Sequence, residues 1–210
     1  MKIKTCKICK NKFDPEKPLQ MVCKKIECAI EYGRIHLKRT KIESDKKKRL
    51  ERKELKECIK TSKDYRNELQ RKINALVRSI DEGCKCISCG QVKPLDAGHF
   101  KASGAHRTIT FHLLNIWGQC RSCNSYRDSK YQYFDGLIEL VRQDLFDVIV
   151  NLPLQYKELK LDIEQLKQAS KNVTECMKFV KSYKSDKQLP LSPSERIELR
   201  KVCNNLIGIY

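Results

Sequence analysis

The cysteines are the residues whose spacing most clearly predicts chemistry. Eight of the twelve fall into close pairs, and a spacer of two residues lets both thiolates of a tight turn reach one zinc ion about 2.3 Å away. With four sulfur ligands, each site is closed to substrate and therefore structural. Cys84 is an alternative to Cys86 as a ligand, but only Cys86 has the two-residue spacer. The sequence predicts two structural Zn²⁺ sites, with ligands Cys6, Cys9, Cys23 and Cys28 in the first and Cys86, Cys89, Cys120 and Cys123 in the second.

The segment enclosed by the second cysteine set carries groups suited to cutting a phosphodiester. A neutral imidazole, with an ordinary pKa of about 6.5, can accept a proton from water at cellular pH, so His99 is the candidate general base. A hard divalent ion, Mg²⁺ or Mn²⁺, would bind the scissile phosphate and the leaving oxygen. Asn124 and an acidic oxygen suit such an ion, with Asp96 as the first choice. Asp128 is the second, because Asn124 and Asp128 are four apart on one helix face.

The order of these residues resembles a known class of enzyme. His99, then Asn115, then a Cys-x2-Cys pair followed at once by Asn124 and soon by a basic residue resembles the HNH nucleases. Within that class, the string Asp-Ala-Gly-His-Phe from Asp96, and the later Gln-Cys-x2-Cys-Asn, resemble the phage NinG (Rap) family of recombination proteins. The cysteine-rich N-terminus and the lysine-rich segment after it are similar to that family too.

The resemblance implies a fold, an activity and roles for particular residues. The fold would be a small treble-clef or ββα-metal core, two strands and a helix gripping one metal. The activity would be an endonuclease acting on branched recombination intermediates such as Holliday junctions and D-loops, from a phage or prophage in a bacterial host. Asn115 would brace the loop and orient His99. The commonest HNH pattern has an acid or a histidine immediately before the base, where this chain has Gly98.

Charge makes nucleic acid the leading partner. Lys and Arg number 44 against 26 Asp and Glu, a formal net charge of +18, which attracts a polyanion. There is no long apolar run for a membrane, and Met1 to Lys12 is polar and lacks a secretory signal, so we expect an intracellular protein. The candidate DNA-binding residues are Lys46, Lys47, Lys48, Arg49, Arg52, Lys53, Arg121, Arg127 and Lys130.

Around these sites the sequence predicts mainly helix, in an α+β protein with long flanking α-helices. Residues 34–82 contain neither Gly nor Pro, which favours one long helix or two abutting ones. Ser192, Pro193 and Glu195 have the pattern of a capped helix start. We expect four parts: an N-terminal zinc module (1–33), a basic helical segment (34–83), the nuclease core (84–150) and a C-terminal helical region (151–210).

Other interpretations remain open at this point. The chain could be an HNH endonuclease of restriction or homing type, a non-catalytic zinc protein that binds DNA, or a scaffold whose helices pair with another subunit. Symmetric cutting of a four-way junction would need two active sites, so a homodimer is plausible. Apolar seams over 55–80 and 159–180 could form its interface, or could pack on each other.

Overall fold

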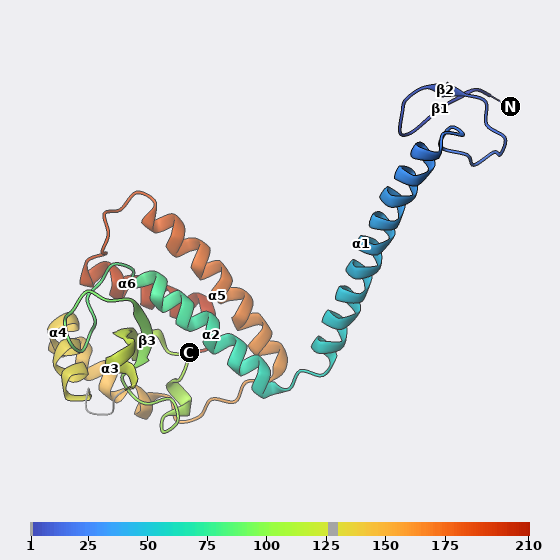
Figure 1. The fold of residues 1–210 in the computed structure, drawn as a ribbon. Coiled ribbons are helices and arrows are strands. Elements are labelled where there is room, and N and C mark those ends of the chain that lie inside the picture. The colour runs from blue at the N-terminus through green and yellow to red at the C-terminus, as the bar shows by residue number, and fades with distance from the viewer. Residues whose placement is uncertain (1, 126–129) are drawn as a thin grey trace. The chain divides into compact units, whose positions relative to one another are not determined.

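The protein is mostly helical, with two small antiparallel hairpins and two four-cysteine clusters. The computed structural model describes residues 2–125 and 130–210. Arg127 and Asp128 lie outside the described residues, as does the side chain of Lys130. The chain divides into two compact units, residues 1–60 and 61–210 (Figure 1).

The first unit consists of a cysteine-bearing hairpin and a long exposed helix. Strand β1 (Lys4–Thr5) pairs with β2 (Lys12–Phe13), and α1 (Ile26–Cys58) follows. In α1 only Cys28 is buried. Charged residues cover the remainder, and some pair along the helix, as Lys47 does with Glu51 at 4.0 Å. This helix is therefore solvated on every side within its own unit.

The second unit is built on packed helices. Helix α2 (Ser62–Ile80) packs along α5 (Ile163–Lys184), which in turn contacts α6 (Pro193–Ile207) (Figure 1). Each of the three begins with a capping box, at Thr61, Asp162 and Ser192 respectively, so that side chains satisfy backbone N–H groups at the helix start. The start predicted at Ser192 is confirmed.

The long segment predicted as one helix or two is two, separated at residues 59–61. The apolar seam of α2 faces α5 through fully buried side chains. Leu55 and Ile59, which come before α2, are exposed. The buried positions of α2 are Leu69, Ile73, Leu76 and Ile80. The two apolar seams therefore pack on each other within one chain.

A two-stranded hairpin lies between two hydrophobic clusters. Strand β3 (Leu95–His99) pairs antiparallel with β4 (Ile116–Cys120), with His99 opposite Ile116. On one face Ala97 and Ile116 join the cluster of α2, α5 and α6. On the other, Trp117 joins the cluster of α4 (Lys130–Gln155), a helix that is broken at Arg142, whose φ is 65°. Two short 3₁₀ turns, η1 (Arg107–Ile109) and η2 (Leu113–Asn115), connect the strands, and α3 (Arg121–Ser125) follows β4.

Two element boundaries bear on the expected four parts. Helix α1 begins before residue 34, and α4 runs across residue 150. The four-part division itself stays a prediction. Among the described residues, no helix combines the length and apolar character needed to cross a membrane.

Candidate functional site

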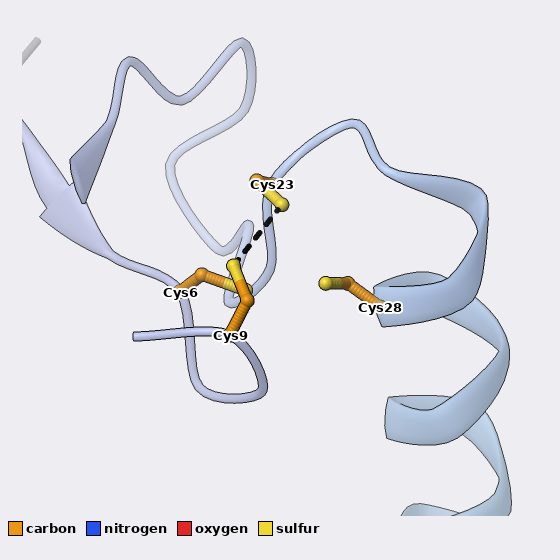
Figure 2. A group of neighbouring side chains, drawn as sticks. All are labelled: Cys6, Cys9, Cys23 and Cys28. Carbon is orange, nitrogen blue, oxygen red and sulfur yellow. Dashed lines mark hydrogen bonds between the residues drawn. The ribbon is translucent and has the colours of Figure 1, made fainter. Parts of the chain in front are cut away.

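Both cysteine quartets are gathered into clusters. In each, the four sulfur atoms lie within 4.8 Å of one another. Cys9 Sγ and Cys23 Sγ are 3.7 Å apart, and Cys89 Sγ and Cys120 Sγ are 3.9 Å apart. With Zn–S bonds of about 2.3 Å, the sulfurs of a tetrahedral zinc site are separated by about 3.8 Å. The clusters are therefore consistent with two structural zinc sites; Figure 2 shows the first, formed by Cys6, Cys9, Cys23 and Cys28.

The two clusters start from the same backbone turn. In the first, Cys6 N donates to Asn11 O at 2.9 Å and Lys10 N to Cys6 O at 3.0 Å. In the second, Cys86 N donates to Gln91 O and Gly90 N to Cys86 O, both at 2.9 Å. Lys10 and Gly90 occupy equivalent places, with positive φ of 63° and 65°. The last ligand is in each case the third residue of a helix, Cys28 in α1 and Cys123 in α3.

Thiol pKa values diverge inside each cluster. For Cys6, burial raises the pKa, but hydrogen bonds from the backbone of Cys23 and Cys9 outweigh it and bring the value to about 6. A hydrogen bond from Ser122 lowers the pKa of Cys120 to about 6. Burial and neighbouring sulfurs raise the pKa of Cys28, and likewise that of Cys123, to about 12. Four thiolates this close need a cation to be charged together, which a zinc ion would supply.

His99 is the last residue of strand β3, four residues along the strand from Leu95, which pairs with the cluster ligand Cys120. Its Nε2 lies 3.0 Å from the carbonyl oxygen of Thr110. A carbonyl can only accept, so in the neutral ring Nε2 carries the proton and Nδ1 is the basic nitrogen. Burial lowers the pKa of His99 below its ordinary value of 6.5, although the Thr110 carbonyl acts in the opposite direction. The imidazole is therefore neutral at pH 7 and has one nitrogen able to accept a proton.

Asn115 closes the connection between the two strands. Its fully buried side chain accepts from Lys101 N at 2.8 Å and donates to Lys101 O at 3.1 Å and Ile109 O at 3.4 Å. Its backbone carbonyl accepts from Phe100 N at 2.8 Å, directly after His99. Asn115 thus fixes both ends of the 100–109 loop.

The position before His99 has no room for a side chain. A Cβ at Gly98 would overlap the side chain of Gln119, whose own Cβ would be 2.9 Å away. Buried Tyr133 of α4 donates to Gly98 O at 2.9 Å and holds the strand at this point. The departure from the usual HNH pattern at this residue therefore follows from packing.

Asp96 is not brought to the same side of the strand as His99. The two are three residues apart in β3, and successive side chains alternate between faces, so they leave the strand on opposite faces. In residues 2–125 and 130–210 the only groups of three or more His, Cys, Asp and Glu ligands gathered within 4.8 Å are the two cysteine clusters.

The remaining expected site residues are on the surface or outside the described residues. Asn124 is exposed on α3, a helix that contacts β3, the strand of His99. Arg121, on the same short helix, is exposed as well. Asp128, Arg127 and the side chain of Lys130 belong to the part that is not described. The expected basic residues of α1 are all exposed: Lys46, Lys47, Lys48, Arg49, Arg52 and Lys53.

A buried ion cluster behind the hairpin was missed by sequence reasoning. Asp81 is fully buried; its Oδ1 accepts from Arg196 Nε at 2.8 Å and its Oδ2 from Arg200 Nη2 at 2.6 Å. Oδ2 also accepts from Gly118 N of β4 at 2.6 Å. Arg200 stacks on Trp117, its guanidinium carbon 3.8 Å from the ring centroid. The two arginines on one helix, four apart, were a signal that α6 has a charged buried face.

The last residues of the chain contact the loop that holds His99. Tyr210 Oη accepts from Phe111 N at 3.1 Å and donates to Thr108 O at 2.9 Å, on either side of Thr110. Asn204 of α6 accepts from Leu113 N at 2.9 Å. The C-terminal segment therefore supports the turn whose carbonyl orients the imidazole.

Comparisons with known proteins identify a family. The family described as bacteriophage lambda NinG protein matches residues 1–183. The NinG protein of Escherichia phage 933W is 28% identical over 163 residues, covering 69% of this chain and 78% of that protein. The NinG protein of Escherichia phage lambda is 27% identical over 132 residues, covering 61% and 63% respectively. No solved structure matches the chain. This chain belongs to the bacteriophage lambda NinG protein family.

Proposed function

We propose that the protein is a metal-dependent DNA endonuclease of the HNH type that cleaves branched recombination intermediates. One observation carries the proposal: a half-buried, neutral histidine, whose Nε2 is engaged by a backbone carbonyl, ends the first strand of a hairpin whose other end is closed by a four-cysteine cluster. A protein that only binds DNA has no need of such a base. The preference for branched DNA rests on the resemblance to NinG (Rap) proteins.

In this proposal β3, β4 and α3 form the ββα core. The strands pair in the order required, and α3 contacts both. The second cysteine cluster joins the turn before β3 to the end of β4 and the start of α3. Its role is to fix the pairing of the two strands from the end opposite His99.

His99 accepts a proton from the attacking water at Nδ1. The Thr110 carbonyl keeps Nε2 protonated and thereby fixes the tautomer and the ring plane. Asn115 holds the loop that carries Thr110 through its bonds to Lys101 and Ile109. Because burial lowers the His99 pKa, the base stays available somewhat below pH 6.5 and is lost as the pH falls through that lowered value.

A divalent ion, Mg²⁺ or Mn²⁺, would supply charge stabilisation at the scissile phosphate. The described donors alone do not form its site, because Gly98 lacks a side chain and Asp96 is on the other face of β3. Asn124 is the described candidate ligand, and Asp128 is the acidic candidate that remains. Asp96 is therefore the second choice, after Asp128, as the acidic ligand of the divalent ion.

The decisive experiment compares labelled four-way junction, flap and linear duplex DNA, each with and without Mg²⁺ or Mn²⁺. We expect metal-dependent cutting of the branched substrates. His99→Ala should lower the rate on the order of 10² to 10⁴, the usual loss for a general base, while zinc content and DNA affinity stay unchanged. His106→Ala is the matched control, because His106 lies in the same loop region, whereas the imidazole hydrogen-bonded to the Thr110 carbonyl is that of His99.

Three results would decide against this proposal. Cutting by His99→Ala at the rate of the unmodified protein would remove the imidazole from the reaction. DNA binding with no metal-dependent cleavage of any substrate would favour the non-catalytic zinc protein. Efficient cutting of linear duplex at defined sequences would favour an HNH enzyme of restriction or homing type.

A further inference from the structure

A hollow of about 660 Å³ opens between the first half of α2 and the segment 103–111. One wall is the helix surface that carries Lys63, Arg66 and Asn67. The other is the loop from Ser103 to Thr110 with the turn η1. The volume is in the range of about 300–1,000 Å³ typical of ligand sites. Every lining residue belongs to the second unit.

The lining carries positive charge only. Lys63, Arg66 and Arg107 contribute three cations, and no lining residue is acidic. Lys63 and Arg107 are exposed, and Arg66 is half-buried, with one weak contact to Leu159 O at 3.5 Å. In the part of the chain that the structure describes, none of the three forms a salt bridge with a carboxylate. Unpaired cations facing each other across a hollow favour an anionic ligand.

The hollow is directly connected to the candidate base. Thr110 lines it, and the carbonyl of the same residue accepts from His99 Nε2 at 3.0 Å. The hydroxyl of Thr110 donates to Ser103 O at 3.4 Å across the loop wall. An anion in the hollow is therefore separated from the imidazole by one residue.

We propose that this hollow binds the sugar–phosphate backbone of the DNA beside the loop that orients His99; the inference rests on the nuclease function proposed above and gives that site a substrate-binding surface. Backbone recognition is favoured over a nucleotide pocket because no aromatic face is offered to a base. Phe111, the aromatic residue of the lining, is buried at 2% exposure. The cations stand on two walls, which suits successive phosphates better than a single one.

The test is a triple substitution of the hollow, Lys63→Gln, Arg66→Gln and Arg107→Gln, in the full-length protein. Binding to a labelled four-way junction is measured by fluorescence anisotropy without divalent metal, over a salt series. We expect a loss of affinity of about tenfold or more, and a log–log salt slope that is flatter by about 2.7, since each lost contact with duplex DNA removes about 0.9.

The matched control removes the same charge elsewhere in the second unit. Lys171→Gln, Lys181→Gln and Lys201→Gln replace three exposed lysines on α5 and α6. Its affinity should change less than about twofold. Zinc content and far-UV circular dichroism confirm that both triple variants are folded.

A second measurement uses the unmodified protein. Lysine acetylation followed by mass spectrometry should show Lys63 protected by the junction, and Lys171 unprotected. Equal losses in the hollow and control variants, no loss in the hollow variant, or free acetylation of Lys63 in the complex would overturn the inference. So would protection of Lys63 by a millimolar mononucleotide as strong as that by the junction. If the hollow variant alone loses DNA affinity and the junction protects Lys63, but the protein cuts no substrate, DNA binding in the hollow would be supported and the nuclease function refuted.

Discussion

The two four-cysteine modules share a turn but differ in what surrounds it. In residues 6–28 the cluster is the core of its module, and the helix that supplies Cys28 buries nothing else. In residues 86–123 the cluster is built into a hydrophobic core. Helix α4 approaches so closely that a Cβ at Gly136 would overlap the carbonyl oxygen of Ile87.

This difference teaches that one metal-binding turn can serve two purposes. Where no core exists, the ion must supply the folding free energy of the module. Where helices already cover the cluster, the ion is left to fix geometry, here the end of the hairpin at which Leu95 pairs with Cys120. Four predictions test this contrast, and single-tryptophan fluorescence separates the modules, because Trp117 lies in the second.

The largest expected effect is that of metal removal. The protein should contain two zinc ions per chain, and Cys9→Ser and Cys89→Ser should each lose one. Apparent binding free energies of structural zinc are on the order of 10–16 kcal/mol, so Cys9→Ser should leave residues 2–25 open to proteases. The urea midpoint of Trp117 should then be unchanged, because the ligands and their hydrogen bonds lie within residues 6–28.

Cys89→Ser should behave differently, and elemental analysis with urea titration would show it. We expect a lower Trp117 midpoint together with loss of any cleavage, while helices α2 and α5 persist by circular dichroism. Equal shifts of the Trp117 midpoint in the two variants would contradict the contrast.

Asp81→Asn should destabilise the second unit alone. The substitution leaves Arg196 and Arg200 buried without their counter-charge, which typically costs about 3–5 kcal/mol. Urea unfolding followed at Trp117 measures the loss, and zinc in the first cluster should be retained. Glu82→Gln is the neighbouring control: Glu82 is exposed, and its partner Lys184 keeps a hydrogen bond to Ser79 O at 2.8 Å, so the substitution should cost about 1 kcal/mol. A similar cost for both would show that the buried cluster adds nothing.

Acid should act on the second unit through His112. Burial lowers the pKa of this imidazole to about 4. The unfolded state, with a pKa of about 6.5, therefore takes up a proton between pH 6.5 and 4 that the folded state excludes. The free energy of unfolding should fall with falling pH in this window, by up to about 3 kcal/mol.

His112→Gln should remove most of this dependence of the free energy of unfolding on pH. Unfolding is followed by the fluorescence of Trp117, with zinc content held equal. His106→Gln is the control and should keep the dependence, since His106 is only half-buried. A slope unchanged in His112→Gln would assign the acid response to other groups.

The smallest effect concerns the shared turn. Lys10 adopts the left-handed conformation that glycine tolerates, and Gly90 has it without strain. Lys10→Gly should stabilise the first cluster by about 1 kcal/mol, because it removes backbone strain. Gly90→Ala should destabilise the second cluster by a similar amount. An added Cβ at Gly90 meets nothing within 4 Å, so the cost there is backbone strain alone. Chelator competition would show each as a change of roughly fivefold in zinc affinity. Opposite signs would refute the equivalence of the turns.

Local patterns were predictable from the sequence. The cysteine spacing gave both clusters, the capped start at Ser192 was present, and the apolar seams marked α2 and α5. These features depend on residues a few positions apart, whose geometry follows from helix and turn periodicity. The break at Thr61 also had a local signal, since Asp64 follows it at the spacing of a capping box.

Contacts between distant residues were not predictable. Nothing near Gly98 in the sequence shows that the side chain of Gln119 fills the space beside it. The face of the strand on which Asp96 lies likewise depends on the bounds of β3, which the structure supplies. Asp81 meets Arg200 across 119 positions, and the four-residue spacing of Arg196 and Arg200 does not identify Asp81 as their partner. The hollow beside Thr110 likewise exists only once α2 and the 103–111 segment meet.

The C-terminal support of the hairpin has a practical consequence for defining the smallest working fragment. The family match ends at residue 183, and a boundary chosen there would look natural. Such a fragment would lose Arg196 and Arg200, leaving Asp81 as an isolated charge beneath β4, and would release the Thr108–Phe111 turn from Tyr210. A tag fused directly after Tyr210 would strain the same contact. Truncation and tagging strategies should therefore keep residues 184–210 intact and carry any fusion at the other end of the chain.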